Sequence, residues 1–171
     1  MKLGDGVEQA IHSVAMLASL AQDELLSAAA LAEFHGVSSS YLLKHLQALS
    51  RAGILATVPG PKGGYRLASH PGDVSLLDVV LAIEGPGPAF RCKEIRRNGP
   101  NPLPDRYYST PCEINAAMLR AERVYRAELR KVTIADLLAE VTEADDGALA
   151  ERSCTFLKAH VRRTKPGAGK S

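Results

Sequence analysis

Residues 38–68 read SSSYLLKHLQALSRAGILATVPGPKGGYRLA, which joins one helical pattern to two short strand-like runs. Leu42, Leu43, Leu46 and Leu49 recur at helical spacing, so the first half predicts an amphipathic helix that ends at the first glycine. The runs ILATV and YRLA are joined by PGPKGG, whose proline and glycine residues favour a hairpin loop. The segment therefore predicts a helix followed directly by a two-stranded β wing.

Two more helices are predicted before this segment. Apolar residues recur at helical spacing over residues 4–20, which indicates an amphipathic helix. Ser27 is a good N-cap for the next helix, and Gly36 is a typical helix end. The stretch EFHGVSSSYL then supplies the short, glycine-containing turn of a DNA-binding helix-turn-helix. Three helices and a wing, in this order, predict a winged helix-turn-helix over residues 1–84.

The second half of the chain is also predicted to be mainly helical. Ser75 and Asp78 form a capping-box pattern in front of LLDVVLAIEG, which predicts a helix. A proline-rich loop over residues 85–111 is followed by a long charged helix over residues 111–132 and a last helix capped by Thr133. Residues 146–171 are less periodic, and we expect this C-terminal extension to be partly disordered. The fold class is mainly α with a small β wing.

Composition excludes several classes of protein. Hydrophobic residues make up 46% and charged residues 23% of the chain, as in an ordinary globular protein. We find neither a signal peptide nor an apolar run of about 18 residues, so we predict a cytoplasmic protein with no membrane partner. A phosphate loop, paired catalytic carboxylates and a Ser/His/Asp arrangement are also missing. We therefore predict that the protein is not an enzyme and has no small-molecule substrate.

The N-terminal end of the helix in residues 38–53 is the predicted base-reading element, because recognition helices enter the major groove by this end. Hydroxyl and backbone N–H groups can bind phosphates or base edges there, and basic side chains of the wing can follow the phosphate backbone. The predicted DNA-binding residues are Ser38, Ser39, Ser40, Tyr41, Lys44 and His45 in the helix and Lys62 and Arg66 in the wing. Any one of them alone is equally compatible with a solvated surface, but the whole pattern favours double-stranded DNA as a partner.

Two of the three cysteines, Cys92 and Cys112, lie at the two ends of the proline-rich loop. Glu8 and His12 are spaced i, i+4, so their side chains leave one face of a helix about a turn apart, which suits two ligands of one metal centre. Such a pair is more often an ordinary surface pair. A zinc site of Cys2HisGlu composition and a thiol switch are both compatible with these residues. Cys154 is interpreted as a half-buried helix residue without a role in this arrangement.

Residues 38–68, followed by VSLLDVVLAIEG, resemble the Rrf-type winged-helix regulators, the group that includes IscR, NsrR and RsrR. The resemblance extends over residues 1–141, and GPKGGYRLA in the wing is its most characteristic part. It implies a DNA-binding transcriptional repressor that acts as a homodimer. In this dimer the helices of residues 112–145, which include a long dimerisation helix, cross their partner, and residues 85–111 form a cluster-binding loop.

Many members of this group carry an iron–sulfur cluster that tunes their binding to promoter DNA. The better-known members have three clustered cysteines in the loop, whereas this sequence has two widely spaced ones. RsrR-like members combine such a pair with a Glu and a His from the first helix of the other subunit. The resemblance therefore implies a redox-sensing regulator with a 2Fe–2S cluster held by Glu8, His12, Cys92 and Cys112. The alternative is a cluster-free thiol-switch or zinc-binding regulator of the same fold.

Overall fold

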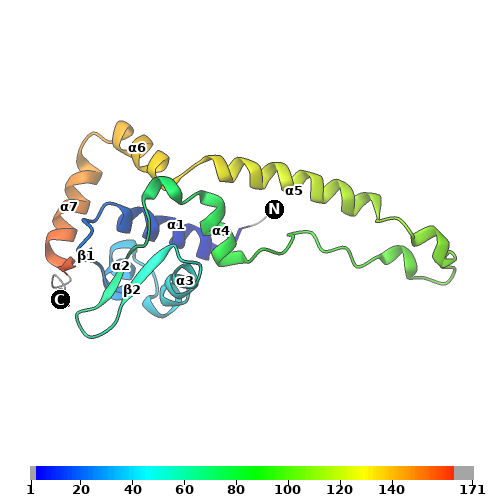
Figure 1. Cartoon of the computed structure of the whole chain (residues 1–171), viewed down its shortest axis with the longest axis horizontal. Helices are drawn as coiled ribbons and strands as arrows, with labels where there is room; N and C mark the ends of the chain where they lie inside the picture. The colour runs from blue at the N-terminus through cyan, green and yellow to red at the C-terminus, as the bar shows by residue number, and fades with distance from the viewer. Residues whose placement is uncertain (1–2, 164–171) are drawn as a thin grey trace, which may run out of the picture.

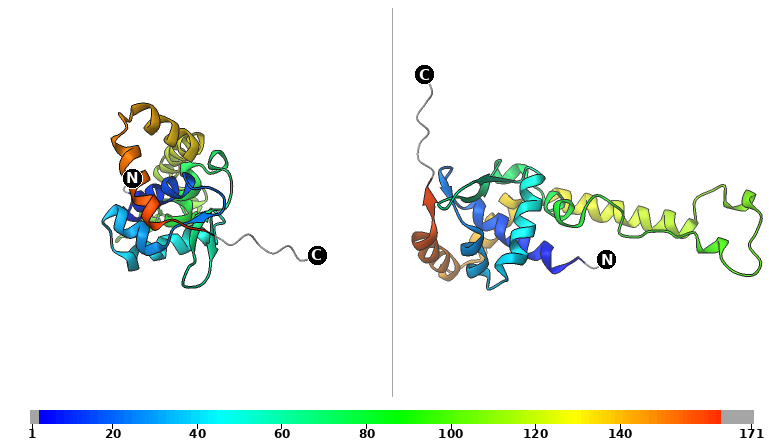
Figure 2. Two further views of the ribbon diagram at one scale, coloured as in Figure 1. Left: turned by 90° about the vertical axis from the view of Figure 1, so that its left-hand side faces the viewer. Right: turned by 90° about the horizontal axis from the view of Figure 1, so that it is seen from below.

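A computed structural model describes residues 3–163 as a helical body with one long projecting arm (Figure 1). The helices are α1 (Asp5–Ala18), α2 (Ala28–His35), α3 (Ser39–Arg51), α4 (Leu76–Glu84), α5 (Glu113–Lys131), α6 (Ile134–Ala144) and α7 (Ala148–His160). The strands are β1 (Glu24–Leu25), β2 (Leu55–Val58), β3 (Gly64–Leu67) and β4 (Arg162–Arg163). In the arm, α5 and the loop that precedes it run side by side (Figure 2). No helix in this part of the chain is long and apolar enough to cross a membrane.

The predicted helix-turn-helix is present in the body. The hydroxyl oxygen of Ser27 accepts the N–H of Ala30 and starts α2, and Gly36 ends it with a φ of 65°. This left-handed conformation suits glycine, which lacks a Cβ. In α3, the leucines at 42, 46 and 49 are fully buried against α1 and α2. Leu43 was assigned to the same face but is 37% exposed, because the adjacent position is rotated by about 100° around the helix axis.

The predicted wing is also present. Strands β2 and β3 pair in antiparallel register, with Leu55 opposite Leu67. Tyr65 and Leu26 exchange two backbone hydrogen bonds of 2.8 and 3.1 Å, which tie the wing to the segment before α2. Gly64 is required next to this bridge, because a Cβ there would overlap the carbonyl group of Leu26. The wing is therefore held firmly at its root.

Two capping boxes fix the place where the arm joins the body. Ser75 and Asp78 form the predicted box at the start of α4, and Thr133 forms a second one with Asp136 at the start of α6. Leu76 N–H donates to the carbonyl of Val132 and Ile134 N–H to that of Val74, both at 2.9 Å. The C-terminal end of α5 is thereby anchored beside α4.

The helix predicted after Thr133 is not the last one, so that part of the prediction was wrong. Residues 148–163 form α7 and β4, and Phe156, Leu157 and Val161 pack against the core of the body. Strand β4 pairs with β1. The predicted disorder falls partly on residues 164–171, which lie outside the described residues. Cys154 lies in α7, but it is exposed and not half-buried as expected.

Candidate metal and DNA-binding sites

One buried ion pair holds the loop before α5 against the arm. Glu122 is 7% exposed, and its carboxylate pairs with the guanidinium of Arg126 at 2.7 Å. It also accepts the backbone N–H of Ala89 at 3.1 Å, and Arg126 donates to the carbonyls of Pro86 and Gly87. Sequence reasoning missed this pair, although its i, i+4 spacing on a charged helix was a signal. The pair satisfies three backbone groups and so directs the loop along α5.

The structure brings the two loop cysteines together. Cys112 is buried and occupies the N-cap position of α5, and Cys92 is exposed. The Cys92 thiol is close enough to contribute to the lowered pKa of the Cys112 thiol. The loop over residues 93–111 therefore begins at one cysteine and returns to the other, so the two ends of the loop lie close together.

The pKa of the Cys112 thiol lies below its usual value mainly because of its position at the start of α5. The N–H group of Asn115 is the largest cause, and that of Ile114 and the charge of Arg96 act in the same direction, whereas desolvation opposes them. A helix N-terminus with a nearby cation is a setting that favours the thiolate. The sulfur of Cys92 in turn accepts the backbone N–H of Glu94 at 3.4 Å. Both sulfurs thus face groups that stabilise negative charge.

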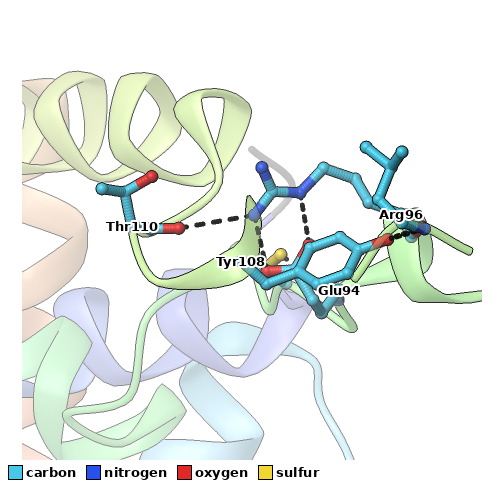
Figure 3. A network of polar contacts seen from close by, with 6 residues as sticks. Glu94, Arg96, Tyr108 and Thr110 are labelled. Atoms are coloured by element: carbon cyan, nitrogen blue, oxygen red, sulfur yellow. Dashed lines mark hydrogen bonds and ion pairs between the residues drawn. The ribbon is translucent and has the colours of Figure 1, made fainter. Parts of the chain in front are cut away.

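Arg96 connects the two sides of this loop (Figure 3). Its guanidinium pairs with the carboxylate of Glu94 and donates to the carbonyl of Thr110 at 3.5 Å, while the Tyr108 hydroxyl donates to the Arg96 carbonyl at 2.9 Å. Glu94 raises the pKa of Arg96, and the two cysteines add to this effect. Arg97 instead pairs with Asp105. Arg96 is thus a basic residue near the cysteines whose positive charge acts on the thiols.

Glu8 and His12 are not brought to the cysteines within one chain. Both are exposed on α1 and line an open groove on the body. Across residues 3–163, no cluster of three or more His, Cys, Asp or Glu side chains could hold a metal ion. The chain therefore carries two halves of the predicted ligand set, a thiol pair on the arm and a Glu–His pair on the body. A four-ligand site made from these residues requires a second chain.

Helix α3, which carries the predicted base-reading end, and the turn of the wing lie on the lower side of the body in Figure 1. Exposed side chains at these places are those of Ser38, Ser39, Ser40, Tyr41, Lys44 and Lys62. The Ser38 hydroxyl contacts that of Ser40 at 3.1 Å and does not cap the N–H groups in the first turn of α3. Arg66 is half-buried and lines a hollow between β3 and the end of α1.

His45 lies in the first half of α3, as predicted, but it is only half-exposed. Its ring packs edge-to-face with Tyr41 at 4.6 Å and lies against α1, so closely that a Cβ on Gly6 would overlap it. Its Nε2 atom is buried and has no partner among the described residues. Burial is the main cause that lowers the pKa of His45; the charge of Lys44 adds to it and that of Glu84 opposes it. His45 therefore packs between Tyr41 and α1 and is half-buried, whereas Tyr41 and Lys44 beside it are exposed.

Comparison with known proteins agrees with this geometry. The family model described as Rrf2, an iron-dependent transcriptional regulator, matches residues 3–140. The chain belongs to the Rrf2 family. The sequence resemblance to Rrf-type regulators is thereby confirmed, and α7 and β4 lie beyond the part that the Rrf2 model matches.

The chain is also similar to individual proteins and solved structures. YffB of Lactococcus lactis, named as a candidate HTH-type transcriptional regulator, is 40% identical over 98 residues, which are 57% of this chain and 63% of that protein. The chain thus spans less than two thirds of this relative. CymR, described as the global cysteine regulator of B. subtilis, has a TM-score of 0.63 at 20% identity. The match covers 82% of this chain and 98% of the CymR chain. IscR of T. potens has a TM-score of 0.63 at 22% identity, and the match covers 85% of this chain and 91% of the IscR chain. The two structures confirm the winged-helix fold.

Proposed function

We propose that this Rrf2-family protein is a homodimeric DNA-binding repressor whose DNA affinity depends on the redox state of a 2Fe–2S cluster. The observation that carries the proposal is the thiol pair of Cys92 and Cys112, in which the lowered pKa of Cys112 favours the thiolate. Thiolates, and not thiols, bind metal ions. The surroundings of the pair, which include Arg96, also suit a group with excess negative charge.

The proposed ligands are Cys92 and Cys112 of one subunit with Glu8 and His12 of the other. Four ligands are the usual number for such a cluster, and histidine replaces cysteine in Rieske-type centres. When bound, the cluster supplies reversible one-electron transfer. Glu8 and His12 project from α1, which packs against α3, so a change in their positions is transmitted to the recognition helix. Arg96 stabilises the thiolates on the opposite half of the site.

An apolar stripe on α5 supports the homodimer. Ile114, Met118 and Val124 are 67%, 44% and 72% exposed, and Ala121 lies on the same stretch of the helix. Exposed apolar side chains that recur every three or four residues are the pattern of a helix that pairs with another helix. A second copy of α5 would cover this stripe and bring a second arm beside the body.

The adjacency of the cysteines also favours a second candidate, a cluster-free thiol switch. In this case hydrogen peroxide oxidises Cys92 and Cys112 to a disulfide, and the two thiols supply the two electrons and two protons that turn the peroxide into two water molecules. The disulfide would tie the loop to the start of α5. Both candidates use the same cysteines but leave different products.

Purification without oxygen distinguishes the two candidates. The cluster predicts coloured protein with about two iron and two sulfide ions per site, and a duplex selected from a random pool should bind with different affinities before and after oxidation. Cys92→Ala and Cys112→Ala should be colourless, and Cys154→Ala serves as the coloured control. Colourless, iron-free protein that forms one disulfide with peroxide would replace the cluster by the thiol switch. Failure to select any duplex would refute DNA binding.

A further inference from the structure

The α7–β4 segment, residues 148–163, runs along the end of the body that lies opposite the arm (Figure 1). Phe156 and Leu157 in α7 pack against the core, and β4 pairs with β1 so that Arg162 lies opposite Leu25. The segment is therefore a folded part of the body, although it lies outside the part of the chain that the Rrf2 model matches.

Helix α7 contacts the C-terminal end of α2, which leads into the turn of the helix-turn-helix. The ring of Phe156 packs against that of Phe34 with a centroid distance of 5.0 Å. The Arg152 guanidinium lies 4.7 Å from the centre of the Phe34 ring and donates to the Phe34 carbonyl at 3.3 Å. His160 stacks on Phe156 at 4.0 Å and lies 3.6 Å from the carboxylate of Glu33. Three side chains of α7 thus hold the end of the helix that precedes α3.

Strand β4 contacts the turn of the wing through Arg162. Its guanidinium donates from one nitrogen atom, Nη1, to the carbonyl of Pro61 at 3.2 Å and to that of Gly63 at 2.8 Å. These two residues flank Lys62, the exposed basic residue in the turn of the wing. Gly63 is buried, and a Cβ there would overlap the carbonyl of Val58, so the turn is closely packed. Arg162 therefore fixes the loop that presents Lys62.

Backbone pairing also connects the α7–β4 segment to the root of the wing. Strand β4 pairs with β1, and Leu26, which follows β1, exchanges two backbone hydrogen bonds with Tyr65 in β3. An ion pair of 3.1 Å between Arg163 and Glu24 joins β4 to β1 through their side chains. The same segment therefore contacts both elements of the predicted DNA-binding surface, the helix-turn-helix and the wing.

We propose that the α7–β4 segment positions the wing relative to the helix-turn-helix for DNA binding, with Arg162 as the positioning residue of the wing. The inference rests on the proposed DNA-binding function and requires no contact between the segment and DNA. A duplex fixes the spacing between base contacts of a recognition helix and phosphate contacts of a wing. A wing that is already held at this spacing loses less conformational entropy when DNA binds, so the affinity is higher.

The first measurement follows the wing of the full-length protein without DNA. In Arg162→Ala, amide exchange should rise at least about tenfold at Gly63, whose N–H donates to the carbonyl of Gly60 at 2.9 Å. Exchange at Leu46, which is buried in α3, should stay as slow as in the parent, because the core of the body is unchanged. Equal exchange at Gly63 in parent and variant would show that Arg162 does not fix the wing.

The second measurement uses a duplex that the parent protein selects from a random pool. Arg162→Ala should bind it about tenfold more weakly at about 0.1 M salt, because DNA must then order the released turn. The slope of log K against log salt should not change, since Arg162 donates to carbonyls of the wing and not to phosphate. Arg162→Lys should recover most of the affinity, because both hydrogen bonds come from one nitrogen, which an ammonium group can replace. The control is Lys158→Ala, which removes the same charge from an exposed position in α7 and should bind like the parent.

The possible results separate this inference from the proposed function. If Arg162→Ala binds the selected duplex as tightly as the parent, the positioning role is refuted and the proposed function stands. A slope reduced by about one would show that Arg162 itself contacts phosphate, and equal weakening in Lys158→Ala would trace the loss to charge alone; either result also refutes positioning. If the parent binds no duplex at any salt concentration, the proposed function and the positioning role are both refuted.

Discussion

His45 and His35 are partly buried histidines whose pKa values are lowered, and both lie where helices meet. Burial is the main cause for each; the charge of Lys44 adds to it at His45, and the charges of His12 and Arg152 add to it at His35. The Nε2 atoms of both rings are buried without a partner in residues 3–163. The folded protein therefore favours the neutral form of both imidazole rings.

This predicts a loss of stability in mild acid. A histidine with a lowered pKa in the folded state takes up a proton more readily in the unfolded state, so stability falls as the pH drops below about 6.5. The lowered carboxyl pKa values of Glu24 and Asp136 act at lower pH, below about 4.5. Urea unfolding between pH 7.5 and 5 should show a steady decrease that His35→Gln/His45→Gln largely removes. An unchanged pH dependence in this variant would contradict the role given to these two partly buried histidines.

At the scale of elements, the best-predicted features were those encoded by residues close in sequence. The capping box at Ser75, the N-cap at Thr133, the glycine at the end of α2 and the hairpin of the wing depend on neighbours within a few positions. Helix α7 was missed because its apolar residues are few and contact the body only through the tertiary fold. Contacts such as those of the Arg162 guanidinium with the carbonyls of Pro61 and Gly63 in the wing join residues too far apart in sequence for a local pattern to indicate them.

The ion pair of Glu122 with Arg126 is one such contact, and a substitution can test it. Glu122→Ala leaves the N–H of Ala89 without its acceptor and Arg126 without its partner, so the loop should detach from α5. Loss of a buried charged hydrogen-bond partner costs about 1–3 kcal/mol, so amide exchange at Ala89 should rise at least about fivefold. Glu128→Ala is the control, because it removes an exposed pair with Lys131 on the same helix. Equal exchange in both variants would show that Glu122 does not hold the loop.

At the scale of the whole molecule, the sequence supplied the residues of the candidate site but not their arrangement. Cys92 and Cys112 could be expected near each other because they border one loop, and the structure places them so. The separation of Glu8 and His12 on the body from the thiols on the arm depends on the direction of α5, which no motif encodes. The proposed site therefore requires two chains that pair through their α5 helices.

Charged residues in the apolar stripe of α5 should therefore prevent dimerisation. Met118→Glu or Val124→Glu would bury two unpaired carboxylates in a symmetric interface, and the dissociation constant should rise about 100-fold or more. Arg123→Glu, at an exposed position on the opposite face of the same helix, is the control. Sedimentation equilibrium at micromolar concentration gives the result. Variants that remain dimeric would place the interface elsewhere.

The most direct test of the shared site mixes two variants that each lack part of the proposed ligand set. Bound iron and visible absorption are measured after reconstitution without oxygen. Cys92→Ala alone and Glu8→Ala/His12→Ala alone should each bind little iron, because each lacks one half of the ligand set. If the ligands come from both subunits, the mixed dimer regains one intact site, so about half of the dimers in an equal mixture should recover one cluster each. Absence of any recovery, or a full cluster in Cys92→Ala alone, would contradict the account.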